Sequence, residues 1–324
     1  WQDRGYISEG RLHLEKILRN VLDAQVYKDP SKIEALAKSL WAAGSLAWIQ
    51  GDYASARSQL EESVRLWRGL GEAGQLGLAI SLREVGIVSI YQGEVDYGQT
   101  ILEESIRLLQ QADSKWNLAL AFYNQGLVYE SKDDIPRVRT NFEESLSLFR
   151  ELNEPWGLAV ALNGLGRIAG REARYDAARS YLEESLKLSQ ALKDPWSVAT
   201  TLYLLGEVAR LQEDHAAAIN HYTQSMVLNQ TVGDQVMIGF TLHNLGKIAH
   251  LQGQLHWAAQ LYGAAKALRE DSANTKTWSL TDQAQCEQDV AQLCNAMGED
   301  IFSTAWAEGQ AMNVDEAIAY ALTL

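Results

Sequence analysis

The chain has 324 residues, with 28 Lys or Arg against 42 Asp or Glu, which gives a formal net charge of −14. Such an acidic protein is a poor general binder of nucleic acid or of an anionic membrane, because both carry phosphate groups that repel it. Its composition, 47% hydrophobic and 22% charged with four prolines, is typical of a soluble, all-helical protein with a continuous core.

Further features of the sequence indicate where the protein works. No run of about 18 apolar residues occurs, so we expect no membrane span, and no secretory signal is recognisable. The two cysteines, Cys286 and Cys294, offer neither a disulfide framework nor a four-ligand metal site, which favours a reducing cytoplasm. Because the first residue is Trp1 rather than Met, we expect a piece of a longer chain.

Residues 1–33 predict an incomplete unit at the N-terminal end. Gly5-Tyr6 precedes Leu14-Glu15 in the way that Gly51-Asp52-Tyr53 precedes Leu60-Glu61 further along. Residues 1–20 therefore correspond to the second helix of a unit whose first helix is missing. We expect residues 1–33 to form a truncated repeat that caps the helices that follow.

Residues 34–275 contain six copies of one segment. A glycine recurs at positions 44, 86, 126, 166, 206 and 246, at intervals of 42, 40, 40, 40 and 40. Apolar and small residues precede it at helical spacing, and a turn follows seven residues after it. Leu, Phe or Tyr comes sixteen residues after it, in four units at the head of a Leu/Phe-Glu-Glu-Ser block. A fixed period of this length predicts stacked helix pairs.

This pattern resembles the tetratricopeptide repeat, in a long form similar to that of kinesin light chains and of bacterial regulators like the maltose-regulon activator. The resemblance implies an all-α, right-handed superhelical solenoid with helical caps. It also implies that the first helix of each unit lines a concave groove, where such repeats bind their partners.

Beyond residue 275 the period stops, and residues 276–324 predict a C-terminal helical cap, with helices at about 279–297, 299–310 and 314–323. Residues 261–270 and 305–322 resemble the C-terminal end of bacterial signal-transduction ATPases of the STAND class. The resemblance implies that the chain is the sensor arm of such a regulator. Its nucleotide-binding domain would lie elsewhere in the same full-length chain.

The sequence itself offers no cofactor site. Gly246-Lys247 lies inside a predicted helix and lacks the upstream glycine of a phosphate loop. His243 and His250 are seven residues apart with no nearby carboxylate, which disfavours a metal site. No Ser-His-Asp or Cys-His arrangement can be assembled, so we expect no catalytic residues and no enzyme.

Two repeated features have a structural and a functional interpretation. Glutamate pairs recur in four units, whereas a catalytic pair occurs once, so a surface and helix-pairing role is favoured over acid–base chemistry. Trp116, Trp156 and Trp196 recur every 40 residues and could stack sugars or bases. Their place between units favours packing of one repeat against the next.

The predicted groove carries a polar cluster in an otherwise apolar set of helices. Its helical positions hold six basic and three acidic side chains. Asn side chains can bond a peptide backbone in both directions, and Arg can hold a carboxylate bidentately. We therefore predict that a protein, a peptide or a small anionic effector binds there, through Arg83, Tyr123, Asn124, Asn163, Arg167, Tyr203, Glu207, Arg210, His243 and Lys247.

Two alternatives remain open. The cluster could be a solvated face whose charges happen to be mixed. The whole protein could also be a structural adaptor that scaffolds a complex without acting as a switch.

Overall fold

The structure is a computed structural model that describes residues 9–14, 16, 18, 29–270 and 280–323. These residues are helical apart from short turns, and none of them lies in a strand, which confirms the predicted all-α class. The chain divides into two compact units, Trp1–Ala161 and Leu162–Leu324. Their boundary in the sequence falls within helix α8 (Pro155–Arg171).

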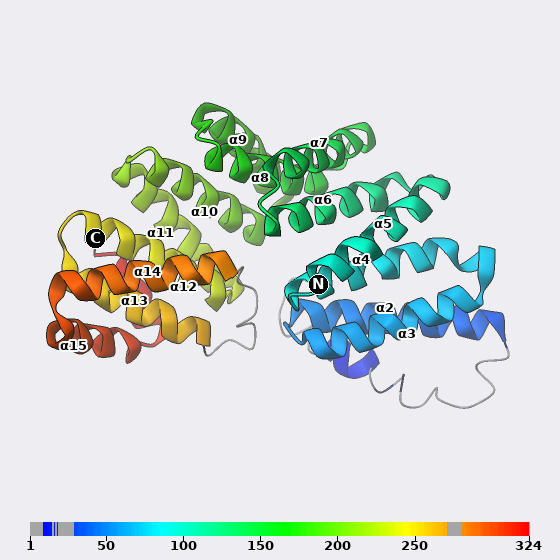
Figure 1. Cartoon of the computed structure of the whole chain (residues 1–324), viewed down its shortest axis with the longest axis horizontal. Helices are drawn as coiled ribbons and strands as arrows, with labels where there is room; N and C mark the ends of the chain where they lie inside the picture. The colour runs from blue at the N-terminus through cyan, green and yellow to red at the C-terminus, as the bar shows by residue number, and fades with distance from the viewer. Residues whose placement is uncertain (1–8, 15, 17, 19–28, 271–279, 324) are drawn as a thin grey trace. The chain divides into compact units, whose positions relative to one another are not determined.

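The first unit consists of three helix pairs and the start of α8 (Figure 1). The two helices of each pair lie against each other, and successive pairs pack together. The helices are α2 (Pro30–Ile49), α3 (Tyr53–Gly69), α4 (Gln75–Tyr91), α5 (Val95–Gln111), α6 (Lys115–Ser131) and α7 (Ile135–Leu152), with the 3-10 turn η2 (Gly71–Gly74) before α4. Residues 9–14 are helical, and most of the predicted truncated repeat lies outside the described residues.

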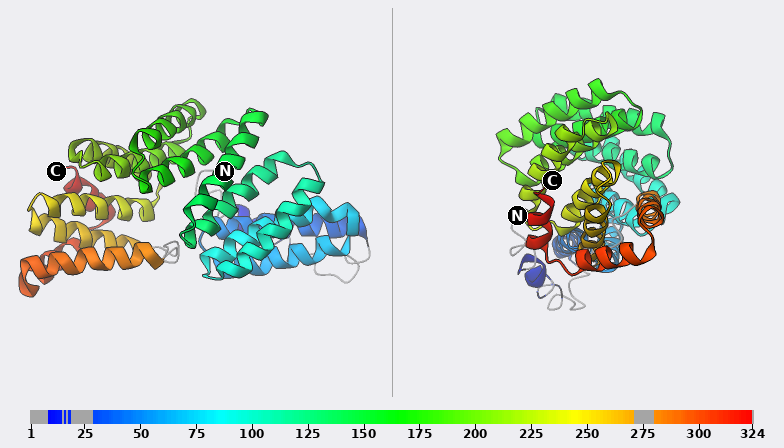
Figure 2. Two further views of the ribbon diagram at one scale, coloured as in Figure 1. Left: turned by 45° about the horizontal axis from the view of Figure 1, so that its top comes forward. Right: turned by 90° about the vertical axis from the view of Figure 1, so that its left-hand side faces the viewer.

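The second unit continues from α8 with α9 and two complete pairs, which Figure 2 shows from two further directions. Three helices follow at its end, where α15 packs on α13 and α16 contacts α11, α12 and α13. The helices are α9 (Tyr175–Leu192), α10 (Pro195–Leu211), α11 (His215–Val232), α12 (Gln235–Leu251), α13 (Leu255–Glu270), α14 (Leu280–Met297), α15 (Glu299–Gln310) and α16 (Val314–Ala321).

Each recurring glycine makes room for one side chain of the paired helix. A Cβ added at Gly206 would lie 2.6 Å from the ring of Tyr222, and one at Gly246 would lie 2.6 Å from the ring of Tyr262. The other four recurring glycines face a leucine or a phenylalanine in the same way. The glycine and the residue sixteen positions later therefore set how closely the two helices of a pair approach.

The serine of the Leu/Phe-Glu-Glu-Ser block joins the two helices of a pair. Ser105 Oγ donates a hydrogen bond to the carbonyl oxygen of Ala79 at 2.7 Å, and Ser63 Oγ donates to that of Ala37 at 2.8 Å. Both serines are fully buried. Because these bonds form inside the core, the block contributes to the structure of the repeat.

The turns between helices use left-handed residues and aspartate caps. Gly51 has a φ of 77°, and Glu213 occupies the corresponding turn with a φ of 62°. In the second of these turns the Asp214 side chain then accepts a hydrogen bond from the backbone N–H of Ala217 and so caps α11. A left-handed residue ends one helix and an N-cap aspartate begins the next.

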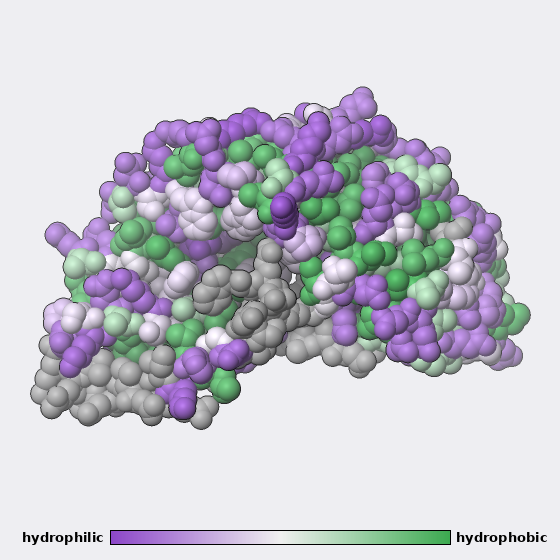
Figure 3. Space-filling model, turned by 180° about the vertical axis from the view of Figure 1, so that it is seen from behind, coloured by the Kyte–Doolittle hydropathy of each residue, from purple (hydrophilic) through white to green (hydrophobic). Residues whose placement is uncertain are grey.

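One apolar stretch in the first unit has the length and hydropathy of a weak candidate membrane span, although it contains no unbroken apolar run. It covers Gly71–Tyr91, and no other helix among the described residues meets the same test. The stretch is 61% buried inside the fold, because α4 packs between α3 and α5. It therefore has the burial of a core helix. On the face of the molecule seen in Figure 3, hydrophilic side chains are interspersed with hydrophobic patches.

Candidate partner-binding surface

The ten residues predicted to bind a partner lie on the first helices of successive pairs. We call this set the candidate groove face, with one part in each of the two units. In the first unit α4 carries Arg83, and α6 carries Tyr123 and Asn124. In the second unit the residues are Asn163 and Arg167 on α8, Tyr203, Glu207 and Arg210 on α10, and His243 and Lys247 on α12.

On α4, a buried ion pair holds Arg83. Its Nη2 lies 2.6 Å from Oε1 of Glu84, the next residue in the sequence, and the two residues are 7% and 8% exposed. The Nε of Arg83 is buried and has no hydrogen-bond partner among the described residues. A ligand that binds Arg83 therefore has to compete with Glu84 for the guanidinium.

On α6, the two predicted residues differ in their surroundings. The Tyr123 ring stacks on Phe142 with centroids 5.0 Å apart, while Asn124 is 7% exposed. In the second unit Tyr203 packs on Tyr222 in the equivalent positions, at 5.8 Å. The tyrosines thus rest on the same aromatic side chains for which the recurring glycines make room.

Two polar residues of the second unit connect first helices to one another. Asn163 Oδ1 on α8 accepts a hydrogen bond from Thr201 Oγ1 on α10 at 3.0 Å. Tyr203 Oη on α10 accepts one from Asn244 Nδ2 on α12 at 2.9 Å. Arg167, one turn along α8 from Asn163, is partly exposed. The two hydrogen bonds therefore join successive repeats.

A charged network lies on α10. Arg210 Nη2 is 3.2 Å from Glu207 Oε2, and the hydroxyl of Tyr222 donates a hydrogen bond to Glu207 Oε1. Burial raises the pKa of Tyr222, so its hydroxyl keeps its proton. Burial opposes the charge on Arg210, but Glu207 outweighs it and raises the pKa of the guanidinium. The side chains of Arg210 and Glu207 are 20% and 27% exposed.

On α12, the cap helix α14 covers the two predicted residues. Asp289 of α14 places Oδ2 3.0 Å from His243 Nε2 and 2.8 Å from Lys247 Nζ. His243 is 3% exposed, and its ring stacks on Tyr262 with centroids 4.5 Å apart. Figure 1 shows α14 (orange) alongside α12 and α13, which it contacts. This end of the candidate groove face is therefore occupied by the chain itself.

Burial determines the protonation states at this contact. Burial lowers the pKa of His243 to about 4, although its hydrogen bond to Asp289 acts in the opposite direction. Burial also acts to raise the pKa of Asp289, but the hydrogen bonds from His243 and Lys247 outweigh it and lower that pKa to about 2. At neutral pH a neutral histidine thus donates from Nε2 to a charged aspartate, which also pairs with Lys247.

Three residues that matter here are absent from the sequence-based set. Tyr222 and Tyr262 could have been found, since each lies sixteen positions after a recurring glycine and faces the polar residues of its own pair. Asp289 had no such signal. It lies after the period stops, and 42 residues separate it from Lys247.

The repeated tryptophans show both packing and exposure. In the first unit the rings of Trp116 and Trp156 stack at 6.5 Å with an interplanar angle of 22°, so successive repeats do meet there. Trp116 nevertheless remains 40% exposed, and Trp196 in the second unit is 46% exposed.

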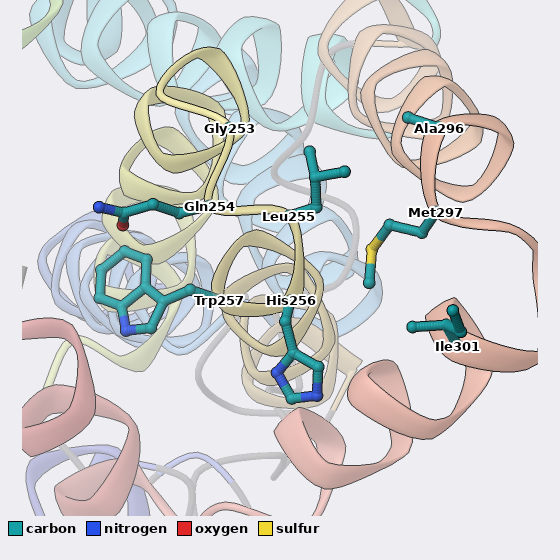
Figure 4. Close-up of a pocket in the computed structure, with 8 residues that line it drawn as sticks. All are labelled: Gly253, Gln254, Leu255, His256, Trp257, Ala296, Met297 and Ile301. Carbon is teal, nitrogen blue, oxygen red and sulfur yellow. The ribbon is translucent and has the colours of Figure 1, made fainter.

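A separate hollow of about 680 Å³ lies among the end of α14, α15 and the start of α13 (Figure 4). In Figure 4, Met297 and Ile301 reach toward Leu255 and His256. None of the ten predicted residues lines it. Among the residues that the structure describes, no group of three or more His, Cys, Asp or Glu is placed to hold a metal ion.

Part of the chain matches a known family. Residues 117–191 and 197–271 both match the sequence model described as tetratricopeptide repeat. These segments cover helices α6–α9 and α10–α13, which are four of the six helix pairs. Together with the observed helix pairs, the matches give the protein an all-α tetratricopeptide-repeat fold, as the resemblance implied.

One curated relative is similar over a short stretch. A Mycobacterium tuberculosis protein named as an HTH-type transcriptional regulator is 47% identical over 64 residues, which are 19% of this chain and 7% of that protein. The chain therefore spans only a small part of the length of the curated relatives it matches.

Solved structures extend the likeness over most of the chain. A STAND protein with a tetratricopeptide repeat sensor, from Pyrococcus horikoshii, is 10% identical with a TM-score of 0.55, over 96% of this chain and 45% of that one. The Rap conjugation gene regulator of the plasmid pLS20, in complex with the Phr* peptide, is 14% identical with a TM-score of 0.55, over 89% and 73% of the two chains. At such low identity these likenesses establish the fold alone.

Proposed function

We propose that the chain is the non-enzymatic sensor arm of a larger bacterial, cytoplasmic STAND-type signalling regulator. It binds a protein, a peptide or a small anionic effector on the candidate groove face. One observation carries the proposal: α8, α10 and α12 are linked by buried amide side chains, and beside these lie charged side chains that remain partly accessible, as Arg210 and Glu207 do. A face that only packed would bury apolar groups there instead.

The comparisons support the setting of this proposal. The STAND protein from Pyrococcus horikoshii carries a tetratricopeptide repeat sensor, and the mycobacterial relative is named as a transcriptional regulator. The Rap regulator was solved with a bound peptide. By this analogy the partner of the present chain is a peptide or protein effector, and its second partner is the nucleotide-binding domain of the same full-length chain.

The rival function is a structural adaptor without a switch. The reading frame upstream of the Trp1 codon separates the two. An in-frame phosphate-loop sequence followed by a helical region supports the sensor arm, because a STAND regulator needs a nucleotide-binding domain. A start codon directly before Trp1 would leave only the adaptor.

Binding can be tested without knowing the natural effector. A random peptide library displayed on phage is selected against the chain, and the affinities of the selected peptides are measured by calorimetry. Arg167→Ala combined with Arg210→Ala should weaken binding about tenfold or more, because charge-assisted hydrogen bonds to a ligand are lost.

The matched control is Glu143→Ala combined with Glu183→Ala. Both glutamates are exposed on second helices, α7 and α9, away from the candidate groove face. Affinity lost in this control but kept in the arginine pair would refute the assignment of the face. Because Arg210 is ion-paired, the melting temperature of each variant is measured alongside, and only folded variants are compared.

A further inference from the structure

The helix α14 is attached to the second unit by a narrow contact. Leu293 is fully buried, and Val290 and Met297 are partly buried against side chains of α12, α13 and α15. Most other described side chains of α14 are exposed. The segment that joins α13 to α14 lies outside the described residues. Beside this apolar contact, Asp289 joins α14 to α12 through His243 and Lys247.

The positions of Lys247 and Tyr262 have counterparts in the preceding repeat, where the polar contact is a different one. On α10, Glu207 follows the recurring glycine, and its carboxylate accepts the hydrogen bond from the Tyr222 hydroxyl. On α12, Lys247 stands in that position instead. On α10 the carboxylate comes from the helix itself, whereas on α12 it comes from Asp289 of α14.

Asp289 provides hydrogen-bond partners for only some of the buried polar groups around it. The hydroxyl of Tyr262 and the Nδ1 of His243 are both buried, and neither has a hydrogen-bond partner among the described residues. Tyr262 is 1% exposed and His243 is 3% exposed. A buried polar group without a partner carries a free-energy penalty. A ligand that reached the tyrosine hydroxyl with a carboxylate oxygen would bind here better than Asp289 does.

We propose that His243, Lys247 and Tyr262 form a carboxylate-binding site for an acidic peptide segment, and that α14 occupies this site through Asp289 as an internal competitor. The inference rests on the proposed function, because it gives the chemistry of the partner at one end of the candidate groove face. Other charged or titratable groups near Asp289 are Arg269 on α13 and Cys286 on α14. An acidic partner binds only when α14 leaves the site. The strength of the α14 contact therefore sets how tightly the partner must bind in order to displace it.

The test uses the full chain and charge reversal on α14. Asp289→Lys places a cation beside Lys247 and should release the helix, because like charges at this distance repel. Glu287→Lys makes the same charge change at an exposed position of α14 and is the matched control. Hydrogen–deuterium exchange of residues 284–297 is measured for both variants and for the unchanged chain. A synthetic peptide of residues 284–297 is then titrated against each, beside a version with Asn at the position of Asp289.

We expect exchange in α14 to rise about tenfold or more in Asp289→Lys, with α10 and α11 still protected and Glu287→Lys unchanged. The aspartate peptide should bind Asp289→Lys and neither other chain, and the asparagine peptide should bind none. Unchanged exchange in Asp289→Lys, or a peptide that binds all chains alike or none, would overturn the inference. If the inference fails in this way but the affinity of the phage-selected peptides still depends on Arg167 and Arg210, the proposed function stands. Only the role of α14 as a competitor is then refuted.

Discussion

At the scale of single residues, the recurring glycine and its partner sixteen positions later show how a sequence period becomes a packed interface. The period indicated where the glycines are, and the structure shows the reason: Gly206 accommodates the ring of Tyr222. The sequence could not show that Arg83 is held by Glu84, because the burial that makes this pair matter depends on the surrounding helices.

Two glycines of α8 allow a matched test of this close approach. A Cβ at Gly166 would lie 2.6 Å from Leu182 Cγ, whereas one at Gly170 would meet only Val208 Cγ2, at 3.4 Å. Gly166→Ala should lower the free energy of unfolding by about 1–3 kcal/mol, since the two helices must move apart. Gly170→Ala should be neutral or stabilise by up to about 1 kcal/mol, because alanine favours the helix. Urea unfolding measures both, and an equal effect of the two changes would contradict the packing argument.

The serines of the repeated block provide a second matched pair. Ser105 donates a buried hydrogen bond to Ala79, while the Ser145 hydroxyl is buried without a hydrogen-bond partner among the described residues. Ser105→Ala should therefore cost about 1 kcal/mol of unfolding free energy, and Ser145→Ala should cost nothing or stabilise the fold. Denaturant midpoints of the two variants decide this. A larger loss of unfolding free energy for Ser145→Ala than for Ser105→Ala would show that the serines of the block do not stabilise the fold through this hydrogen bond.

At the scale of elements, periodicity predicts the helix pairs, whereas the sequence does not predict how the helices of the cap pack. Three helices occupy residues 280–321, where the sequence pattern indicated three helices, yet nothing in it placed α14 on α12. Outside the repeats no period relates one helix to another, so the contact between Asp289 and Lys247 depends on tertiary packing alone. The burial of His243 consequently could not be predicted from the sequence of its own helix.

The burial of His243 makes stability depend on pH. The pKa of His243 is lowered by burial to about 4 from the ordinary 6.5. Between these values the unfolded state takes up a proton that the folded state does not, so stability must fall as pH falls. The loss should total roughly 3 kcal/mol between pH 6.5 and pH 4. Asp289, whose pKa is lowered to about 2, adds a separate loss below pH 3.8.

Urea unfolding between pH 7.5 and pH 4 measures this dependence, with His243→Gln as the test variant. The glutamine should reduce the slope across this range, because it has no proton to take up. His256→Gln, the same substitution at an exposed position on α13, is the control. An identical slope in all three proteins would mean that His243 is not the group responsible.

At the scale of the whole molecule, the fold followed from the sequence and the partner did not. A period of about 40 residues predicts stacked helix pairs whatever the groove carries, because stacking depends on small and apolar residues such as Gly166 and Leu182. The binding that we propose depends on polar residues such as Arg167, and the residue at this position differs from repeat to repeat without disturbing the stack. For that reason the chemistry of the candidate groove face had to be read from contacts in the structure.

The crystal structure of the chain with one phage-selected peptide bound is the most direct test of the account. We expect peptide atoms within about 4 Å of Arg167 and Arg210, the distance of an ion pair, with the peptide lying on the first helices α8 and α10. A peptide seated instead on the second helices α9 and α11, with Arg167 and Arg210 untouched, would contradict the claim that the candidate groove face binds the partner.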